Sequence, residues 1–234
     1  MHCHLLPAVD DGVKTTEESL ECLRAAKEAG FTDIVLTRHQ MAGVYTVKPE
    51  EAAAGRELLQ RSIDEAGLGV TVHDGAEHYI DEVFLEKLTD GAESLAHSTA
   101  VLVEIPMTRI PPFMADVAFK MRVKGLAPIL AHVERYREVV DDPRRAKALA
   151  EMGFLLQVNL GSLVGVYGRR IAKTARTIIE SGDVFCAGSD VHGPGWIKPC
   201  YQEGVAALFE FGDETARRLL RDNPSKIIRG EALS

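Results

Sequence analysis

The chain has 234 residues, of which 46% are hydrophobic and 26% are charged. This is enough apolar material for a sizeable core, and the length fits one domain over residues 1–234 better than two small ones. The net charge of −8 argues against a nucleic-acid groove, which needs clustered Lys and Arg. A phosphorylated ligand stays compatible with this charge, because bound divalent metals reverse the local field.

Membrane insertion and secretion are not expected. No segment approaches the roughly 18 consecutive apolar residues of a spanning helix, and the first residues lack a secretory signal pattern. The cysteines, Cys3, Cys22, Cys186 and Cys200, are scattered, which predicts a reduced, cytoplasmic protein without a disulfide framework. No arginine stands six positions after any of them, which excludes the signature of phosphatases that use a thiolate nucleophile.

Short apolar runs alternate with longer amphipathic segments, a pattern typical of a parallel sheet with crossover helices. A capping box at residues 15–18 starts a helix that ends at Gly30, and a second helix runs from Pro49 to about residue 67. Further helices are expected over about 81–88, 112–124, 143–152 and 169–181 and in the C-terminal segment. Strands are expected at 33–36, 70–72, 101–103, 128–130, 154–158 and 184–187.

With a short strand at residues 1–4, the pattern gives seven strands, each followed by a helix or a long loop. No linker, repeat or low-complexity tract divides them. A single α/β domain folded as a distorted seven-stranded β/α barrel fits this order best. A doubly wound open sheet is the alternative.

Ionisable side chains lie at or just after the ends of these strands. They are His2, His4, Asp10, Asp11, His39, Glu77, Glu104, His132, Asp190 and His192. In an α/β barrel the carboxyl ends of the strands meet at one face. So many ionisable groups in one cavity would be costly unless they bound metal, and imidazole and carboxylate are ligands of Zn, Mn and Fe. The pattern therefore predicts a polynuclear metal site.

Each motif is weak by itself, and the joint occurrence at successive strand ends carries the prediction. A short His-x-His pair arises by chance, and Glu104 could pair with Arg109 as an ordinary salt bridge. We interpret His73, His78 and His97 as structural or surface residues. The cysteines are expected to pack or to have no chemical role, and Cys3 alternates away from His2 and His4.

Several segments resemble a known family. They are residues 2–12 (HCHLLPAVDDG), 75–77 (GAE), 103–106 (VEIP), 131–135 (AHVER), 157–159 (QVN), 189–192 (SDVH) and 222–228 (DNPSKII). They resemble the PHP-domain, metal-dependent tyrosine phosphatases of bacterial capsule and exopolysaccharide loci. The likeness covers almost the whole chain in the same order. The Asp-Asp-Gly after His-x-His, and Glu at position 104, separate this branch from histidinol phosphatases and polymerase-associated PHP domains.

The resemblance implies a distorted seven-stranded barrel of the PHP, amidohydrolase-like type with a trinuclear site, which is usually active with Mn²⁺. Zn²⁺ and Fe²⁺ are the alternative metals. By analogy, the first metal binds His2, His4, Glu77 and Asp190, the second binds Glu77, Glu104 and His132, and the third binds His39, His192 and Asp11, which we favour over Asp10.

Two cations are expected to bind phosphate. Arg135 falls where the family has a phosphate-contacting arginine, and Lys198 is the nearest candidate for a second cation after the Asp-x-His motif. The alternative for Arg135 is an ordinary surface pair with Glu134 or Asp141.

The reaction that the resemblance implies is hydrolysis of protein phosphotyrosine by a hydroxide that bridges two metals. Arg135 would hold a phosphoryl oxygen, and His192 or the third metal would assist the leaving phenolate. The expected partner is a phosphotyrosine protein, the tail of a bacterial tyrosine kinase, in the regulation of capsule or exopolysaccharide synthesis. The oligomeric state stays open.

Three other functions are alternatives to this one. A PHP phosphatase could act on a small molecule such as histidinol phosphate. A non-catalytic metal-binding regulator could keep the same fold. Two departures from the family pattern favour it: Met1 stands directly before His2, and the segment 37–40 is TRHQ where the family usually has Thr-Pro-His-His. A hydrolase of C–N bonds would need a strand-end lysine to carry a bridging carbamate, and we find none.

Overall fold

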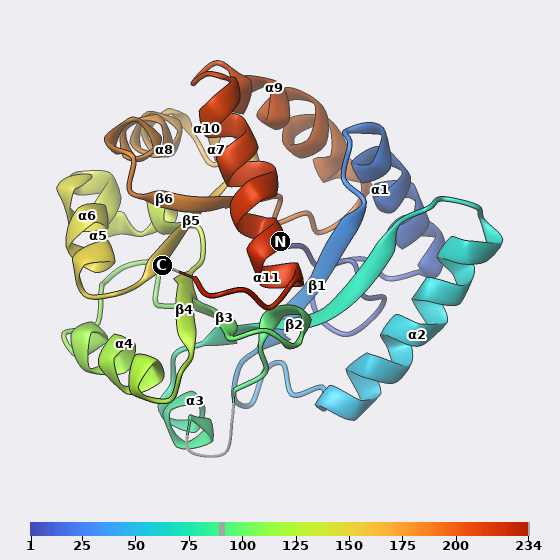
Figure 1. Cartoon of the computed structure of the whole chain (residues 1–234), viewed down its shortest axis with the longest axis horizontal. Helices are drawn as coiled ribbons and strands as arrows, with labels where there is room; N and C mark the ends of the chain where they lie inside the picture. Colours follow the sequence, from blue (N-terminus) through green and yellow to red (C-terminus); the bar gives the residue numbers. More distant parts are fainter. Residues whose placement is uncertain (89–91, 234) are drawn as a thin grey trace.

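The structure is a computed structural model that describes residues 1–88 and 92–233. Its centre is a 6-stranded parallel sheet in which neighbouring strands follow the order of the sequence. The strands are β1 (Asp33–Gln40), β2 (Thr71–Tyr79), β3 (Ala100–Glu104), β4 (Ala127–Leu130), β5 (Leu155–Asn159) and β6 (Val184–Gly188). The sheet curls around a common interior with the helices outside, which makes a half-barrel (Figure 1).

The helices lie mostly between successive strands, as the alternating pattern predicts. They are α1 (Thr16–Glu28), α2 (Pro49–Glu65), α3 (Glu82–Lys87), α4 (Met114–Val123), α5 (Arg137–Asp141), α6 (Arg144–Glu151), α7 (Leu160–Leu163), α8 (Arg169–Ser181), α9 (Val205–Phe209), α10 (Asp213–Arg217) and α11 (Asn223–Ile228). Short 3₁₀ turns cover Leu95–His97, Val133–Arg135 and Pro194–Trp196, and π-helical turns cover Lys198–Gly204 and Arg218–Asp222. The predicted α/β class is confirmed.

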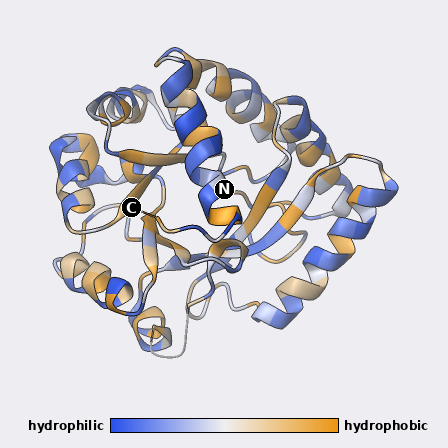
Figure 2. Cartoon of the chain, in the orientation of Figure 1, coloured by the Kyte–Doolittle hydropathy of each residue, from blue (hydrophilic) through white to orange (hydrophobic). Residues whose placement is uncertain are grey.

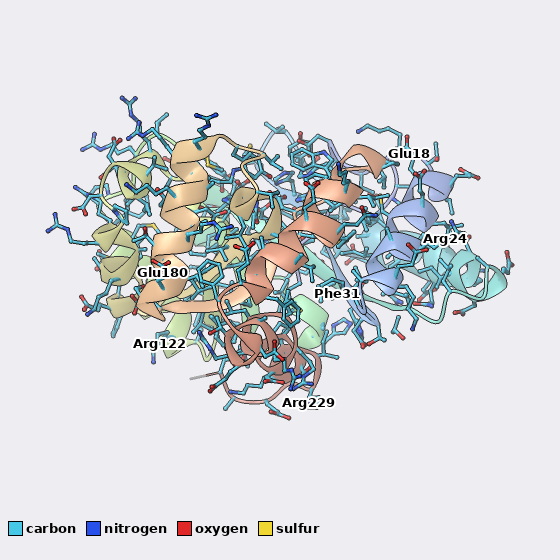
Figure 3. The ribbon with its side chains drawn as sticks, turned by 90° about the horizontal axis from the view of Figure 1, so that it is seen from above. Glu18, Arg24, Phe31, Arg122, Glu180 and Arg229 are labelled. Atoms are coloured by element: carbon cyan, nitrogen blue, oxygen red, sulfur yellow. The ribbon has the colours of Figure 1, made fainter. Side chains whose placement is uncertain are left out.

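The helices pack as amphipathic layers. The side chain of Thr15 accepts a hydrogen bond from the backbone N–H of Glu18 at the start of α1, as the capping box predicts. Figure 2 shows the apolar faces of the helices turned toward the sheet and the polar faces turned outward. Figure 3 shows charged side chains at the periphery, among them Glu18 and Arg24 of α1 and Glu180 of α8. Within the described residues, no helix combines the length and apolar character needed to cross a bilayer.

The expected seventh strand, residues 1–4, is present only as one isolated parallel bridge between Cys3 and Val191. Backbone hydrogen bonds nevertheless hold this segment on both sides. Thr37 N donates to the carbonyl of Cys3, and His4 N donates to that of Val191, both at 2.9 Å. Because only residues 2–4 lie between the carboxyl ends of β1 and β6, the ladder is too short to close the barrel. The prediction of a seven-stranded barrel is therefore replaced by a six-stranded half-barrel.

The interior of the half-barrel is filled with apolar side chains below the carboxyl end. Val35, Leu102, Ile129 and Phe185 from four different strands pack there together with Ile227 of α11. Helix α11 covers the opposite, amino end of the strands, beside the N-terminus (Figure 1). The solid packing leaves the carboxyl end of the strands as the face where polar side chains gather.

Gly12 allows the loop after residue 4 to lie against the N-terminal segment. A Cβ at position 12 would meet the His4 carbonyl oxygen and would lie 2.6 Å from the His4 Cβ. Gly12→Ala should therefore displace His4 or the loop and reduce the free energy of unfolding by about 1–3 kcal/mol, the usual cost of overpacking. Urea unfolding measures this change.

Gly55→Ala in α2 is the matched control, since its added Cβ would lie 3.3 Å from the end of the Leu6 side chain and its nearest contacts outside the helix's own backbone would all be with that side chain. Its stability should stay close to that of the wild type or rise slightly. Equal stability of the Gly12→Ala and Gly55→Ala variants would show that the loop does not press on His4.

Candidate metal centre

The sequence-predicted ligands come together at the carboxyl ends of the strands. Those with buried side chains are His2, His4, Glu77, Glu104, His132 and Asp190. The side chains of His39 and His192 are 14% and 21% exposed, and that of Asp11 is 53% exposed. The centre is therefore deep at one side and opens to solvent beside Asp11.

Glu77 is the carboxylate at which four imidazoles meet. Its Oε1 lies 2.9 Å from His132 Nε2. Its Oε2 lies 3.2 Å from His2 Nε2, 3.5 Å from His4 Nε2 and 3.2 Å from His39 Nδ1. Burial opposes ionisation, but the neighbouring His2 and the hydrogen bond with His132 hold the pKa of Glu77 well below its usual range. The parallel register of β1 and β2 pairs His39 with Glu77 and so brings the imidazole of His39 beside this carboxylate.

Two of these imidazoles are held in one orientation by neighbours on their Nδ1 side. His4 Nδ1 lies 2.8 Å from Asp10 Oδ2, and His2 Nδ1 lies 2.9 Å from Gln157 Oε1. Both partner atoms accept hydrogen bonds, so each Nδ1 carries a proton, and the neutral form of each ring presents a lone pair at Nε2. The two Nε2 atoms lie 3.2 Å apart. A shared cation explains this arrangement, because two facing lone pairs otherwise repel.

Asp10 therefore orients His4 rather than facing the centre. Its carboxylate also accepts hydrogen bonds from the backbone N–H groups of Gly12 and His39, at 2.9 and 3.0 Å. Burial opposes ionisation, but the bond with His4 and these N–H groups lower the pKa of Asp10 to about 2. Asp10 stays ionised at neutral pH and keeps the imidazole of His4 in place.

Asp190 divides its two oxygens between the centre and a supporting network. Oδ1 lies 3.3 Å from His2 Nε2 and 3.4 Å from His4 Nε2. Oδ2 accepts a hydrogen bond from Asn159 Nδ2 at 2.6 Å. The backbone of Asp190 lies in the left-handed region with φ 52°, as does that of His132 with φ 36°. Strained backbone of this kind is typical of functional sites.

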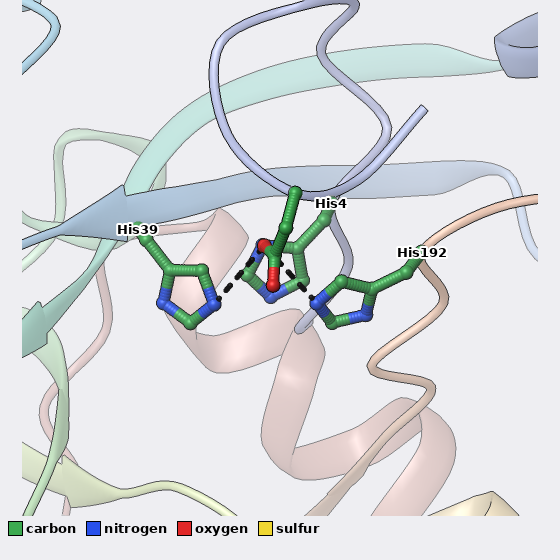
Figure 4. A group of neighbouring side chains, drawn as sticks. His4, His39 and His192 are labelled. Atoms are coloured by element: carbon green, nitrogen blue, oxygen red, sulfur yellow. Dashed lines mark ion pairs between the residues drawn. The ribbon is translucent and has the colours of Figure 1, made fainter. Parts of the chain in front are cut away.

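The exposed side of the centre holds a third group of donors. Asp11 Oδ1 lies 3.5 Å from His39 Nε2 and 3.6 Å from His192 Nε2. Figure 4 shows His4, His39 and His192 turned toward one region. His192 Nδ1 donates to the carbonyl of Asp190 at 2.9 Å, so its Nε2 is the atom that faces the mouth.

The donor atoms fit a polynuclear site for divalent transition metals. They form the groups His2–His4–Glu77, His39–Glu77–Glu104 and His4–Asp11–His39–His192, and within each group the atoms lie within 4.8 Å of one another. Three buried atoms of these residues lack a hydrogen-bond partner among the described residues, namely Glu77 Oε2, His39 Nδ1 and His132 Nδ1. Buried polar atoms are normally satisfied, so the unpartnered Oε2 and His39 Nδ1 support ligation.

Arg135 lies beside this cluster, while Lys198 does not contact it. Arg135 Nη1 donates to Asp190 Oδ2 at 2.9 Å, and the side chain is 25% exposed. Its two alternative partners are engaged elsewhere. Glu134 Oε1 accepts from Asn159 N and Ser162 Oγ, and Asp141 pairs with Arg170. Lys198 is 74% exposed and lies 3.2 Å from Glu203, so its predicted contact with phosphate stays without structural support.

The histidines interpreted as structural lie outside the cluster. His73 Nε2 lies 3.0 Å from Asp33, and His78 Nε2 lies 3.0 Å from the carbonyl of Glu93. His97 is 85% exposed.

The four cysteines are all buried and free. Burial raises the pKa of Cys3 to about 11 and that of Cys22, Cys186 and Cys200 to about 12. The thiols therefore stay protonated at neutral pH, and none is suited to act as a nucleophile.

Five residues near the centre were not predicted as site residues. They are Tyr45, Gln157, Asn159, Tyr167 and Trp196. The ring of Tyr45 stacks on that of His39 with centroids 5.1 Å apart. Gln157 and Asn159 form a chain of hydrogen bonds from His2 to Asp190. The segment 157–159 gave a signal, because it is one of the stretches that resemble the phosphatase family.

Comparisons with known proteins agree with this geometry. The family model described as "Capsular polysaccharide synthesis, CpsB/CapC" matches residues 1–229. The chain is 29% identical to tyrosine-protein phosphatase YwqE of Bacillus subtilis, with 100% of this chain and 92% of that protein covered. It is 30% identical to tyrosine-protein phosphatase CpsB of Streptococcus pneumoniae, with 100% and 99% covered.

Solved structures show the same likeness. A crystal structure from a study of YwqE and CpsB, described as unique metal-dependent tyrosine phosphatases, has a TM-score of 0.92 and 28% identity and covers 100% of this chain and 95% of its own. A lactonase from Listeria monocytogenes has a TM-score of 0.60 at 13% identity, covers 99% of this chain and 94% of its own, and shares the fold alone.

The metal content of a Glu77→Gln variant tests the cluster. The change keeps the size of the side chain but removes the charge that all the neighbouring imidazoles face, so the protein should lose most of its bound metal. Elemental analysis after Mn²⁺ loading and desalting measures the loss. Glu138→Gln is the control, because Glu138 pairs with Arg145 outside the cluster. Full metal occupancy in the Glu77→Gln variant would contradict the site.

Proposed function

This chain belongs to the CpsB/CapC family of capsular polysaccharide synthesis, and we propose that it is a metal-dependent phosphatase that hydrolyses protein phosphotyrosine. The observation that carries the proposal is the buried cluster around Glu77 with a partly exposed arginine at its edge. Carboxylate and imidazole ligands hold metals, and a guanidinium binds a phosphoryl group.

Mn²⁺ is the proposed metal, with Zn²⁺ and Fe²⁺ as the alternatives. We assign His2, His4, Glu77 and Asp190 to one metal, Glu77, Glu104 and His132 to a second, and His39, Asp11 and His192 to a third. When bound, such metals supply an activated water for attack on phosphorus and neutralise the phosphoryl oxygens.

The side chains of the protein orient the phosphate and hold the protons. Arg135 binds a phosphoryl oxygen through the nitrogens that Asp190 does not use. His192 has only Nε2 free toward the mouth, since its Nδ1 donates to the Asp190 carbonyl. Burial and the neighbouring His4 lower the pKa of His192, so the neutral ring suits a ligand better than a proton donor. A phenolate, with a pKa near 10, leaves with little help from an acid.

The proposed substrate is a protein that presents phosphotyrosine at the open side of the centre, where Asp11 is 53% exposed. The tail of a bacterial tyrosine kinase has this chemistry and is the proposed partner, in the regulation of capsule or exopolysaccharide synthesis. We propose that the protein acts in the cytoplasm as one phosphatase domain over residues 1–234.

A comparison of substrates tests the function. Mn-loaded protein should hydrolyse a phosphotyrosine peptide with a higher kcat/KM than histidinol phosphate, and a chelator should abolish turnover that Mn²⁺ then restores. Release of inorganic phosphate measures both. A preference for histidinol phosphate would assign the site to a small molecule, and no turnover of either substrate by metal-loaded protein would support the non-catalytic regulator.

Substitutions of Glu104 and Arg135 should have different effects on metal content and on kinetics. Glu104→Gln removes a charged ligand and should lower metal content and kcat together. Arg135→Lys keeps the charge beside Asp190 but loses the planar, two-pronged geometry. This variant should keep its metals and lose about 10- to 1000-fold in kcat/KM, roughly 1.4–4 kcal/mol of transition-state stabilisation. Normal kinetics in Arg135→Lys would leave the phosphate without this contact.

A further inference from the structure

The guanidinium of Arg135 is held from two directions. Its Nη1 donates to Asp190 Oδ2 at 2.9 Å, and its Cζ lies 4.2 Å from the centroid of the Tyr167 ring. No partner for Nη2 or Nε is found among the described residues, and the side chain is 25% exposed. One edge of the guanidinium is therefore fixed, while the other is free to bind an anion.

Tyr167 and Arg135 donate hydrogen bonds to the same carboxylate oxygen. The hydroxyl of Tyr167 donates to Asp190 Oδ2 at 3.3 Å, the oxygen that also accepts from Arg135. Its ring packs against that of Trp196, with centroids 5.8 Å apart, and Trp196 in turn lies beside the proposed ligand His192. The ring therefore contacts Trp196 as well as the guanidinium, which lies over its face.

Two glycines in the loop that contains Tyr167 allow the backbone turns that place its side chain near Arg135. The loop joins α7 to α8, and Gly165 and Gly168 on either side of the tyrosine have φ of 84° and 98°. Glycine adopts these values without steric cost, so the chain turns twice within four residues. The turns bring a side chain from outside the strand ends back over the metal cluster.

We propose that Tyr167 is a positioning residue, which orients the Arg135 guanidinium toward the phosphoryl group by stacking beneath it and by sharing Asp190 Oδ2. The inference rests on the proposed function, since it concerns how the phosphatase site binds its phosphate. Arginine loses side-chain freedom when it binds, and a stacking ring removes part of that cost before the substrate arrives. Stacking of a cation on an aromatic face also favours the charged, planar group at this point.

A double-mutant cycle tests this link in the full-length, Mn-loaded protein. Tyr167→Leu removes the ring and the hydroxyl but keeps an apolar side chain, and it should lower kcat/KM for p-nitrophenyl phosphate about 10-fold. Tyr167→Phe keeps the stacking ring and should stay within about 3-fold of the wild type. In an Arg135→Ala background, Tyr167→Leu should change kcat/KM by less than about 2-fold, because the group that it positions is gone.

Binding of inorganic phosphate, measured by calorimetry, gives a readout that does not depend on turnover. Tyr167→Leu should weaken it about 10-fold when Arg135 is present and leave it unchanged in the Arg135→Ala background. Phe211→Leu is the matched control, since Phe211 stacks with Arg176 away from the centre. It should leave both kinetics and phosphate binding unchanged.

Two results would overturn the proposal. Equal losses from Tyr167→Leu with and without Arg135 would show a general structural role, and unchanged phosphate affinity in Tyr167→Leu would show no role. Failure of the proposed function looks different, since the wild type itself would then prefer histidinol phosphate to the phosphotyrosine peptide or turn over neither. The calorimetric cycle still decides whether Tyr167 acts through Arg135 in that case.

Discussion

The structure depends on one buried carboxylate, Glu77, that faces four imidazoles at 2.9 to 3.5 Å. Such a cluster without a bound cation would leave charges and lone pairs unsatisfied in a region that is 1% exposed at Glu77. Several elements of the fold hold these side chains in place. Parallel register brings His39 beside Glu77, and the short N-terminal segment lies between β1 and β6 to add His2 and His4. Metal binding and the local fold are therefore coupled.

The cluster has packed apolar side chains on one side and is open to solvent on the other. Below it, apolar side chains from the strands and from α11 close the interior. Around it, Asp10, Gln157 and Asn159 fix the orientation of His4, His2 and Asp190 through hydrogen bonds. At the mouth, the exposed Asp11 and the arginine stacked on Tyr167 face solvent. In the proposed site, a phosphoryl group would reach metals whose candidate ligands are already oriented.

The sequence could predict the order of strands and helices and the residues of the cluster, because these follow from local apolar patterns and from positions at strand ends. The predicted ends of β1 and β2 came too early in the sequence. The strands continue to Gln40 and Tyr79, and the polar residues His39 and Glu77 lie within them with side chains directed toward the site. The sequence also predicted a first strand where only Cys3 forms a bridge. The role of Tyr167 was not predictable, because its contacts with Arg135 and Asp190 join segments far apart in the chain. Lys198 was considered for its charge, but Glu203 nearby in sequence pairs with it.

Anomalous X-ray diffraction from crystals of the Mn-loaded protein, recorded at the manganese absorption edge, shows directly whether the cluster around Glu77 binds metal. We expect more than one anomalous peak within coordination distance of the cluster, with at least one beside Glu77 and the Nε2 atoms of His2 and His4. A fully loaded crystal with no peak beside Glu77, or with its metals bound only elsewhere on the protein, would contradict this expectation.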